Sequence, residues 1–409
     1  MRPLDDITVI EVDGWMAAPS CGAMLADLGA RVIKVEPPQG DPMRNTQRPP
    51  KLPDELKSFD YQFDVDNRGK ESVVVDLTDD RGVDVVHALC RDADVFLCNL
   101  LTERQQRFRL DPESLLAVNP KLVHATFTGY GTTGPEAWRP GFDVTAFFAR
   151  SGLLDASREG PDGVIPMARP AQGDHTAGLA LFGAIVSGLR LAERTGEGQV
   201  VEASLYGTAV WTQATDFAIT AMDRKPVNPR ERERQIQASR NRYRCGDGRW
   251  VVFNIPEESK WPGFCETIGA PDILEDERYI DLTSRFRNMQ ALVARIDEAL
   301  AEKSRDEWAP LFDEAGFVWA PALGLHEVVV DPQAEAIGLF PTLSDETIGD
   351  YRTVANPMVF QTADVLPRTG APALGADTAS ALAAAGIDPD EVEALIAAGV
   401  IAQHAPAAD

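Results

Sequence analysis

Residues 7–36, ITVIEVDGWMAAPSCGAMLADLGARVIKVE, decide the fold. Ile7–Val12 and Arg31–Glu36 are apolar runs rich in β-branched residues, which is typical of buried strands. Between them, Ala17–Leu28 carries apolar residues at helical spacing and ends at Gly29. A strand, a helix and a strand within this length form a βαβ unit, whose two strands lie parallel in one sheet.

The alternation of strands and helices continues along the chain. It predicts strands at Ser72–Leu77, Ala93–Cys98 and Lys121–Phe127, and helices at Arg81–Arg91 and Pro112–Val118. This order is typical of a doubly wound α/β domain, whose ligands bind beyond the carboxyl ends of the strands. We therefore expect one cleft to be lined by the loops at those ends, Asp13–Pro19, Asn99–Arg107 and Gly129–Pro135.

The composition narrows the classes of protein and ligand. A chain of 409 residues is too long for one core and indicates two domains, one of which can be split in sequence. The net charge of −25 argues against nucleic-acid and membrane partners, so an anionic ligand needs local positive charge or helix N-termini. We expect neither a signal peptide nor a membrane span. Five scattered cysteines predict reduced thiols in a cytoplasmic protein, without a metal site.

The second half of the chain differs from the first in local charge and in its predicted elements. The segment 224–244 holds eight basic and two acidic residues, and it is either a solvated linker or a clamp for an anionic ligand. Tyr243–Phe253 predicts a hairpin turned at Asp247-Gly248. With the helices expected around 261–268, 285–302 and 305–315, it forms a smaller α+β domain over 225–331. Leu339–Leu343 and Asn356–Phe360 are predicted to be two further strands.

Asp174 opens a long helix rich in small residues. The run DHTAGLALFGAIVSGLRLAERT, residues 174–195, precedes Gly196, which tolerates a left-handed helix cap. Ala180, Ala184 and Gly188 recur every fourth residue and predict a face bare enough for another backbone. Asp174 is interpreted as the N-cap of this helix, or as a nucleophile or base that the positive helix end keeps ionised. One residue can fill both roles.

The ordered motifs of the chain resemble the class III CoA-transferase family, which includes formyl-CoA and carnitine CoA-transferases and the alpha-methylacyl-CoA racemases. The strongest block is Arg194–Ala203, RTGEGQVVEA. The matching segments run nearly end to end and comprise Leu25–Glu36, Gly40-Asp41, Asn67–Lys70, Ser72, Asp76, Ala93–Val95, Asn99, Asn119-Pro120, Gly129–Pro135, Gly173-Asp174, Tyr243-Arg244, Asp247-Gly248, Ala320-Pro321 and Leu374-Gly375.

This resemblance implies a fold, an assembly and a reaction. It implies a Rossmann-like large domain built from residues 1–224 and 332–409, a small domain over 225–331, and a homodimer of two interlocked rings. It makes Asp174 the nucleophile that attacks an acyl-CoA. The implied reaction moves CoA to a carboxylic acid through an aspartyl-acyl anhydride and an aspartyl-CoA thioester. Coenzyme A is then a substrate, and no permanently bound cofactor is expected.

The resemblance also implies where CoA binds. The expected contacts are Met16, Ala17, Val75, Asp76, Asn99, Leu100, Arg107 and Phe142. Arg107 offers a guanidinium fork for phosphate, and the alternative is an exposed helix arginine. Two departures from the family pattern matter: Pro37 stands where some members carry an arginine, and residues 235–244 lack the glycine loop of formyl-CoA transferase. The second departure argues against a formyl/oxalate substrate pair.

Three other functions compete with CoA transfer. An alpha-methylacyl-CoA racemase pairs the aspartate with a histidine in Gly-His-Asp, but this chain reads Gly141-Phe142-Asp143, and phenylalanine carries no proton. His175 follows Asp174 directly, so its side chain points elsewhere on the helix and is interpreted as structural. A non-catalytic CoA-binding protein would have no need of Asp174. An NAD-dependent oxidoreductase needs a glycine-rich loop, which Asp13–Pro19 is not. The acyl donor and the acceptor acid stay open.

Overall fold

The computed structural model describes residues 1–46, 59–160, 162–226, 231–346 and 348–404. The chain forms two compact units. The first, called here the large unit, consists of residues 1–154, 167–225 and 337–409, so both ends of the chain contribute to it. The second, the small unit, consists of residues 155–166 and 226–336. Residues 155–166 were expected in the large domain; they group with the small unit, where Arg242 forms an ion pair with Glu159 at 3.0 Å.

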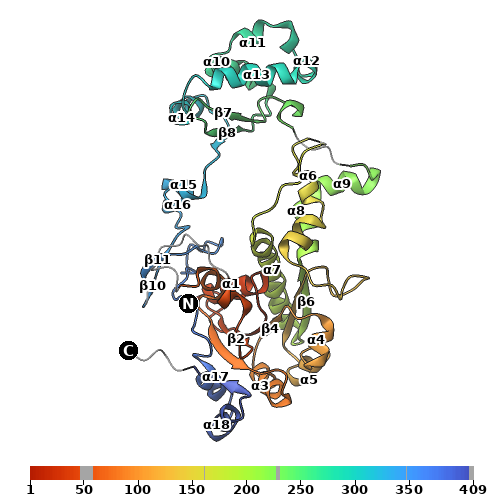
Figure 1. Ribbon diagram of the computed structural model, residues 1–409, viewed down its shortest axis with the longest axis vertical. Coiled ribbons are helices and arrows are strands. Elements are labelled where there is room, and N and C mark those ends of the chain that lie inside the picture. The colour runs from red at the N-terminus through yellow and green to blue at the C-terminus, as the bar shows by residue number, and fades with distance from the viewer. Residues whose placement is uncertain (47–58, 161, 227–230, 347, 405–409) are drawn as a thin grey trace. The chain divides into compact units, whose positions relative to one another are not determined.

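A seven-stranded sheet forms the centre of the large unit, in the order β12-β3-β2-β1-β4-β5-β6 (Figure 1). Its neighbouring strands pair in parallel except for β12, which is antiparallel to β3. The strands are β1 (Thr8–Val12), β2 (Arg31–Glu36), β3 (Glu71–Val75), β4 (Val95–Cys98), β5 (Val123–Thr128), β6 (Gln199–Ser204) and β12 (Ile401–Ala402). The predicted α/β class with a largely parallel sheet is confirmed.

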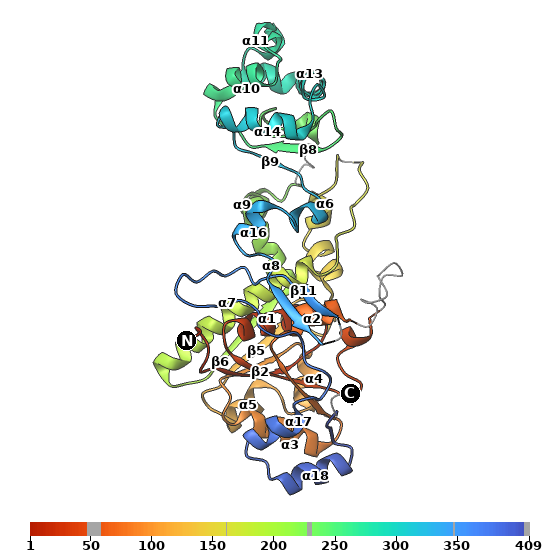
Figure 2. The same cartoon turned by 90° about the vertical axis from the view of Figure 1, so that its left-hand side faces the viewer.

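Helices cover both faces of this sheet. On one face, α1 (Ala17–Asp27), α7 (Gln172–Thr195) and α8 (Leu205–Thr212) share a core with Val9 and Val123 (Figure 2). On the other face lie α3 (Asp80–Cys90), α5 (Pro112–Val118) and the C-terminal helices α17 (Thr378–Ala384) and α18 (Pro389–Ala397). Because both faces are buried, the strands read as continuous apolar runs in the sequence.

Shorter elements complete the large unit. They are η1 (Pro42–Asn45), α2 (Tyr61–Asn67), α4 (Thr102–Arg107), the π-helix η3 (Asp143–Ala149), α9 (Ala214–Asp223) and the hairpin of β10 (Thr342–Asp345) and β11 (Gly349–Arg352). The short helix α6 (Leu153–Ala156) begins in the large unit and ends in the small one. The prediction of a strand at Asn356–Phe360 is wrong. The side-chain amide of Asn356 instead donates to the backbone carbonyl of Val365 at 2.7 Å. At this carbonyl a side-chain hydrogen bond therefore replaces the backbone hydrogen bond of a neighbouring strand.

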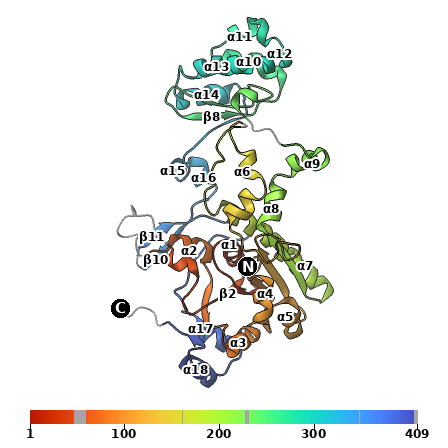
Figure 3. The ribbon, with the colours of Figure 1, turned by 45° about the vertical axis from the view of Figure 1, so that its right-hand side comes forward.

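The small unit is built on a three-stranded antiparallel sheet of β7 (Arg242–Arg244), β8 (Trp250–Phe253) and β9 (Trp319–Pro321) (Figure 3). The predicted hairpin is confirmed, with Gly248 at a φ of +82° in its turn. Trp308, Phe253 and Phe312 are central to its core. The other elements are η4 (Arg232–Arg234), η5 (Glu258–Lys260), α10 (Trp261–Thr267), α11 (Asp272–Glu275), η6 (Glu277–Tyr279), α12 (Leu282–Arg287), α13 (Met289–Leu300), α14 (Arg305–Glu314), α15 (Leu325–Val328) and α16 (Pro332–Ala336).

Helix α7 packs closely against α1, but not through the predicted face. Ala180 is exposed and Ala184 is only half-buried. The close contact lies at Gly178, where a Cβ atom would stand 2.2 Å from Ser20 Oγ and 2.7 Å from the carbonyl oxygen of Ala17. Of the three residues in the predicted face, only Gly188 is buried, and a Cβ there would stand 2.9 Å from Val123 Cγ1 of β5, so this residue approaches the sheet instead of α1.

With 24 residues, α7 is long and apolar enough to cross a membrane by length and composition alone. Its buried residues include Gly178, Leu181, Ile185 and Gly188, which pack within the core of the large unit. The C-terminal cap at Gly196 is confirmed by its φ of +76°.

The contact at Gly178 predicts opposite effects for two glycines of one helix. Gly178→Ala should lower the free energy of unfolding by about 1–3 kcal/mol, because the added methyl overpacks the contact with α1. Gly183→Ala meets nothing within 4 Å and should raise it by up to about 1 kcal/mol through helix propensity. Denaturant unfolding of both variants measures this. Equal effects of the two substitutions would contradict the packing described.

Candidate functional site

Two adjoining cavities lie at the carboxyl ends of the strands in the large unit. The larger has a volume of about 510 Å³ and is lined by the ends of β1, β2 and β3, including Val75 and Asp76. The smaller, of about 250 Å³, contains Asp174 and is lined by residues of all three loops predicted to share a cleft. Both cavities are lined by Trp15, Asn99, Leu100 and Arg104, so these four residues mark their junction.

Asp174 lies in the first turn of α7 but is not its N-cap. The cap is Ala171, which has a left-handed φ of +72°, and Asp174 is the third helical residue. Gly173 before it is required by space, because a Cβ there would stand 2.8 Å from Asp143 Cβ and from the ring of Phe147. The Gly-Asp pair therefore lets the π-helix η3 pack directly beside the carboxylate.

Burial, and after it the charge of the neighbouring Asp143 carboxylate, raises the pKa of Asp174 to about 7. The expectation that the helix end lowers the pKa of this carboxylate is therefore wrong. Loss of solvation and repulsion from a like charge outweigh the attraction of the helix end. Asp143 is itself buried, and its Oδ2 has no hydrogen-bond partner among the described residues.

His175 points away from its neighbour in sequence toward α2. Its Nε2 lies 2.9 Å from Oδ1 of the buried Asp66, and this hydrogen bond, followed by the charges of Asp66 and Asp174, raises the pKa of the imidazole. The contact supports the interpretation of His175 as a structural residue. It also ties the first turn of α7 to the C-terminal part of α2.

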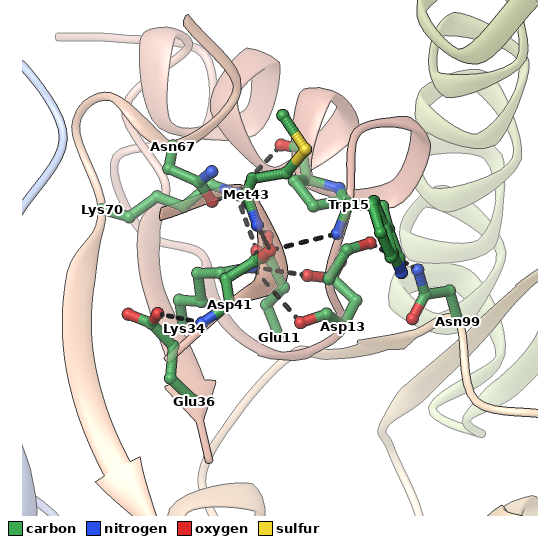
Figure 4. Close-up of polar contacts among 12 residues, drawn as sticks. Glu11, Asp13, Trp15, Lys34, Glu36, Asp41, Met43, Asn67, Lys70 and Asn99 are labelled. Carbon is green, nitrogen blue, oxygen red and sulfur yellow. Dashed lines mark hydrogen bonds and ion pairs between the residues drawn. The ribbon is translucent and has the colours of Figure 1, made fainter. Parts of the chain in front are cut away.

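A buried ionic network lies behind the larger cavity (Figure 4). Lys34 Nζ contacts Glu11 Oε1 at 3.0 Å, Asp13 Oδ1 at 2.8 Å and Asp41 Oδ2 at 3.1 Å. Lys70 Nζ contacts Glu11 at 2.7 Å and also donates to the carbonyl of Pro19 at 2.9 Å. Burial and the charge of Glu11 raise the pKa of Asp13 well above its usual range. Each of the two ammonium groups contacts at least one buried carboxylate.

The network fixes the loop between β1 and α1. Asp41 Oδ1 accepts the backbone N–H of Met43 at 2.8 Å and that of Trp15 at 3.3 Å. The Asn99 amide donates to the carbonyl of Gly14 at 2.7 Å. Trp15 is held at a φ of +68°, a conformation that bulky residues rarely adopt. Strain of this kind persists only where the surroundings hold it, and it is frequent at functional sites.

Several proteins whose sequences are similar to this chain are named CoA-transferases. A sequence model of CoA-transferase family III matches residues 4–378. The chain is 33% identical over 396 residues to (R)-2-hydroxy-4-methylpentanoate CoA-transferase of Clostridioides difficile, covering 95% of this chain and 97% of that one. It is 31% identical over 400 residues to cinnamoyl-CoA:phenyllactate CoA-transferase of Clostridium sporogenes, covering 95% of each.

The chain belongs to CoA-transferase family III.

A solved structure agrees with this assignment. A CAIB/BAIF family protein from Brucella suis superposes with a TM-score of 0.83 at 28% identity, covering 94% of this chain and 99% of that chain. The resemblance drawn from the motifs is thereby confirmed, and the protein is a CoA-transferase.

The residues expected to contact CoA in this transferase divide into two groups. Six of the eight line a cavity: Val75 and Asp76 the larger, Ala17 and Phe142 the smaller, and Asn99 and Leu100 both. Met16 and Arg107 line neither cavity. Met16 is the N-cap of α1, and the guanidinium of Arg107 lies 5.6 Å from the ring centroid of Phe108.

Arg104 lines both cavities but was not among the residues expected from the sequence to contact CoA. It is exposed, forms no ion pair with a described residue, and is the one basic side chain among the described residues lining the two cavities. Glu36 and Asp41 also line the larger cavity, but their charges are directed to Arg44 and Lys34. Arg104 and Arg107 are three residues apart on one short helix, so the sequence alone did not distinguish them.

Three arginines of the basic segment 224–244 form ion pairs within the small unit. Arg232 contacts Asp297 at 2.6 Å, Arg234 contacts Glu231 at 3.0 Å, and Arg242 pairs with Glu159. Residues 227–230 of this segment lie outside the described part of the chain. The arginines named here act as structural ion pairs and give no support to a free anion clamp.

The raised pKa of Asp174 predicts a pH-dependent stability difference. The folded protein holds this proton more tightly than the unfolded chain, so wild-type stability falls as pH rises from about 4, the unfolded pKa, to about 7. Asp174→Asn does not titrate. Its melting temperature relative to wild type should therefore rise between pH 4 and pH 8.

Thermal unfolding across this pH range measures the difference. Asp92→Asn, at an exposed site, is the control and should show no such trend. A constant or falling difference for Asp174→Asn would contradict the described environment of the carboxylate.

Proposed function

We propose that this protein transfers CoA from an acyl-CoA donor to a carboxylic acid acceptor, with Asp174 as the nucleophile. The observation that carries the proposal is a partly desolvated carboxylate inside a cavity that adjoins a larger one at the strand ends. The relatives support a carboxylic acid acceptor, since their names include 2-hydroxy-4-methylpentanoate and phenyllactate.

The proposed reaction needs two pairs of acyl transfers. Ionised Asp174 attacks the thioester carbon, the C–S bond breaks, and CoA leaves as a thiolate from a mixed anhydride. The thiolate then attacks the Asp174 carbonyl, which releases the donor acid and forms an aspartyl-CoA thioester. The acceptor carboxylate attacks this thioester, and the CoA thiolate finally attacks the acceptor's acyl carbon, which regenerates ionised Asp174. No net proton is taken up or lost.

The surroundings of Asp174 suit this chemistry. A carboxylate with a pKa of about 7 is substantially ionised at neutral pH and is more basic than one in water. Low solvation strengthens its interaction with the thioester carbon, and binding supplies proximity. Backbone N–H groups at the start of α7 are suited to stabilise the oxyanion of each tetrahedral intermediate.

We further propose that CoA lies along the two cavities. Its nucleotide would occupy the larger cavity, near Val75 and Asp76, and its thioester would reach Asp174 past Asn99 and Leu100. In a protein of net charge −25, the phosphates need local positive charge, and Arg104 at the junction supplies a guanidinium for them.

The family resemblance also leads us to propose a cytoplasmic, interlocked homodimer. Exposed apolar side chains on α8 and α9 support an interface: Trp211 is 78%, Ile219 62% and Met222 79% exposed. Large exposed apolar side chains of this kind are typical of surfaces that another chain covers. The five cysteines are free and buried, which supports a reducing compartment.

The nucleophile can be trapped chemically. Incubation with an acyl-CoA and hydroxylamine should convert the aspartyl intermediate to a hydroxamate, which peptide mass spectrometry would locate at Asp174. Asp174→Ala should lose transfer activity, while Asp143→Asn, which removes only the neighbouring charge, should keep the trapped species. A modified peptide elsewhere, or full activity in Asp174→Ala, would refute the proposed role.

Arg104→Ala and Arg107→Ala form a matched pair on α4. Loss of a guanidinium–phosphate contact costs about 1.5–3 kcal/mol, so Arg104→Ala should raise KM for acyl-CoA roughly tenfold or more. It should leave KM unchanged for the same acyl group on pantetheine, which lacks the nucleotide. Arg107→Ala should change neither value by as much as twofold.

Arg104→Lys should recover part of the loss, because it restores the charge but not the fork. Steady-state kinetics with both donors measure these effects. A larger defect in Arg107→Ala than in Arg104→Ala would assign the phosphate contact to Arg107 instead.

A further inference from the structure

Two aromatic side chains from distant segments meet at the wall of the smaller cavity. Trp15 follows β1 and Phe142 precedes η3, and their ring centroids lie 5.1 Å apart in an edge-to-face arrangement. Trp15 is 45% exposed and Phe142 is 53% exposed, although both rings are large and apolar. Rings left uncovered inside a cavity are available to contact a ligand.

The position of Trp15 is maintained against its backbone preference. The left-handed φ of Trp15 is one that a glycine would adopt without cost. The Asp41 carboxylate binds its N–H, and Asp41 in turn is held by Lys34. The backbone that carries the ring is therefore held by the buried network, and a glycine would fit the turn itself with less strain. This mismatch points to a role for the ring in the cavity.

The rest of the smaller cavity is almost free of charge. Apart from Asp174, the described residues that line it include one ionisable side chain, Arg104 at the junction with the larger cavity. The remaining wall is mostly apolar and is formed by Ala17, Leu100, Leu101, Phe127, Pro140 and Leu205. An acyl group with a second carboxylate would find no basic side chain among the described residues of this cavity other than Arg104, which we assign to the CoA phosphates.

We propose that Trp15 and Phe142 recognise the acyl group, and that this transferase prefers acyl groups with an aromatic or branched apolar side chain. The inference rests on the proposed function, because the acyl carbon must reach Asp174. The acyl substituent must then lie in the same cavity, whose wall includes both rings. Phe142 lines this cavity and not the larger one, so it contacts the acyl side of the thioester.

The test compares phenylacetyl-CoA, acetyl-CoA and succinyl-CoA as donors to one acceptor. Wild type should show kcat/KM for phenylacetyl-CoA at least about tenfold above that for acetyl-CoA, as an apolar pocket discriminates by such factors. Succinyl-CoA should be the poorest donor. Phe142→Ala and Trp15→Gly should each reduce the phenylacetyl-to-acetyl ratio by roughly fivefold or more.

Three controls keep the test specific. Trp15→Gly relieves the strained φ, so its melting temperature should not fall, and a lower ratio cannot then be attributed to unfolding. Trp15→Phe keeps a ring and should keep most of the preference. Phe286→Ala removes a ring of the small unit that is 53% exposed, like Phe142, and lines neither cavity, so it should leave the ratio unchanged.

Calorimetry separates this inference from the proposed function. With Asp174→Asn, which cannot form the anhydride, phenylacetyl-CoA should still bind more tightly than acetyl-CoA. Absence of transfer by wild type, with this binding preference retained, would refute the function but support acyl recognition. Active transfer without a preference, or a ratio unaffected by both Phe142→Ala and Trp15→Gly, would overturn the inference.

Discussion

The buried pairing of Lys34 and Lys70 with Glu11, Asp13 and Asp41 is the constraint on which the site depends. It joins the ends of β1 and β2 to the segment before β3, and it does so without solvent. Removal of one partner would leave an uncompensated charge in the interior, at a typical loss of about 3–5 kcal/mol. The network therefore specifies one geometry for the loop after β1. That loop carries Trp15 to the junction of the two cavities, and the rest of the ligand path follows from its position.

Asp174 illustrates the opposite use of burial. In the network each charge finds a partner, whereas Asp174 is brought close to a second carboxylate, Asp143, and shielded from solvent. The protein thereby loses stability at neutral pH and gains a carboxylate that is reactive toward a thioester. Such groups are frequent at active sites, because a side chain that lowers the stability of the protein is retained there for its reactivity.

Much of the fold followed from sequence periodicity, and much of the site did not. The βαβ unit, the parallel sheet and the hairpin at Gly248 were readable because apolar spacing and turn residues report local structure. The expected role of Asp174 came instead from the Gly173-Asp174 motif, through the family resemblance. The sequence could not show that η3 would bring Asp143 beside Asp174, which reversed the expected direction of its pKa. It also could not distinguish Arg104 from Arg107, since the choice depends on where a short helix points in the assembled sheet.

The central claim is that the network holds the loop after β1 so that a CoA thioester spans the two cavities and ends at position 174. A crystal structure of Asp174→Asn with an unreacted phenylacetyl-CoA tests this most directly. The account predicts the thioester carbon about 3–3.5 Å from the side-chain oxygen at position 174, as in a near-attack geometry. It also predicts phosphates beside Arg104 and the phenyl ring against Trp15 and Phe142. A thioester bound away from position 174, or a nucleotide outside the larger cavity, would contradict it.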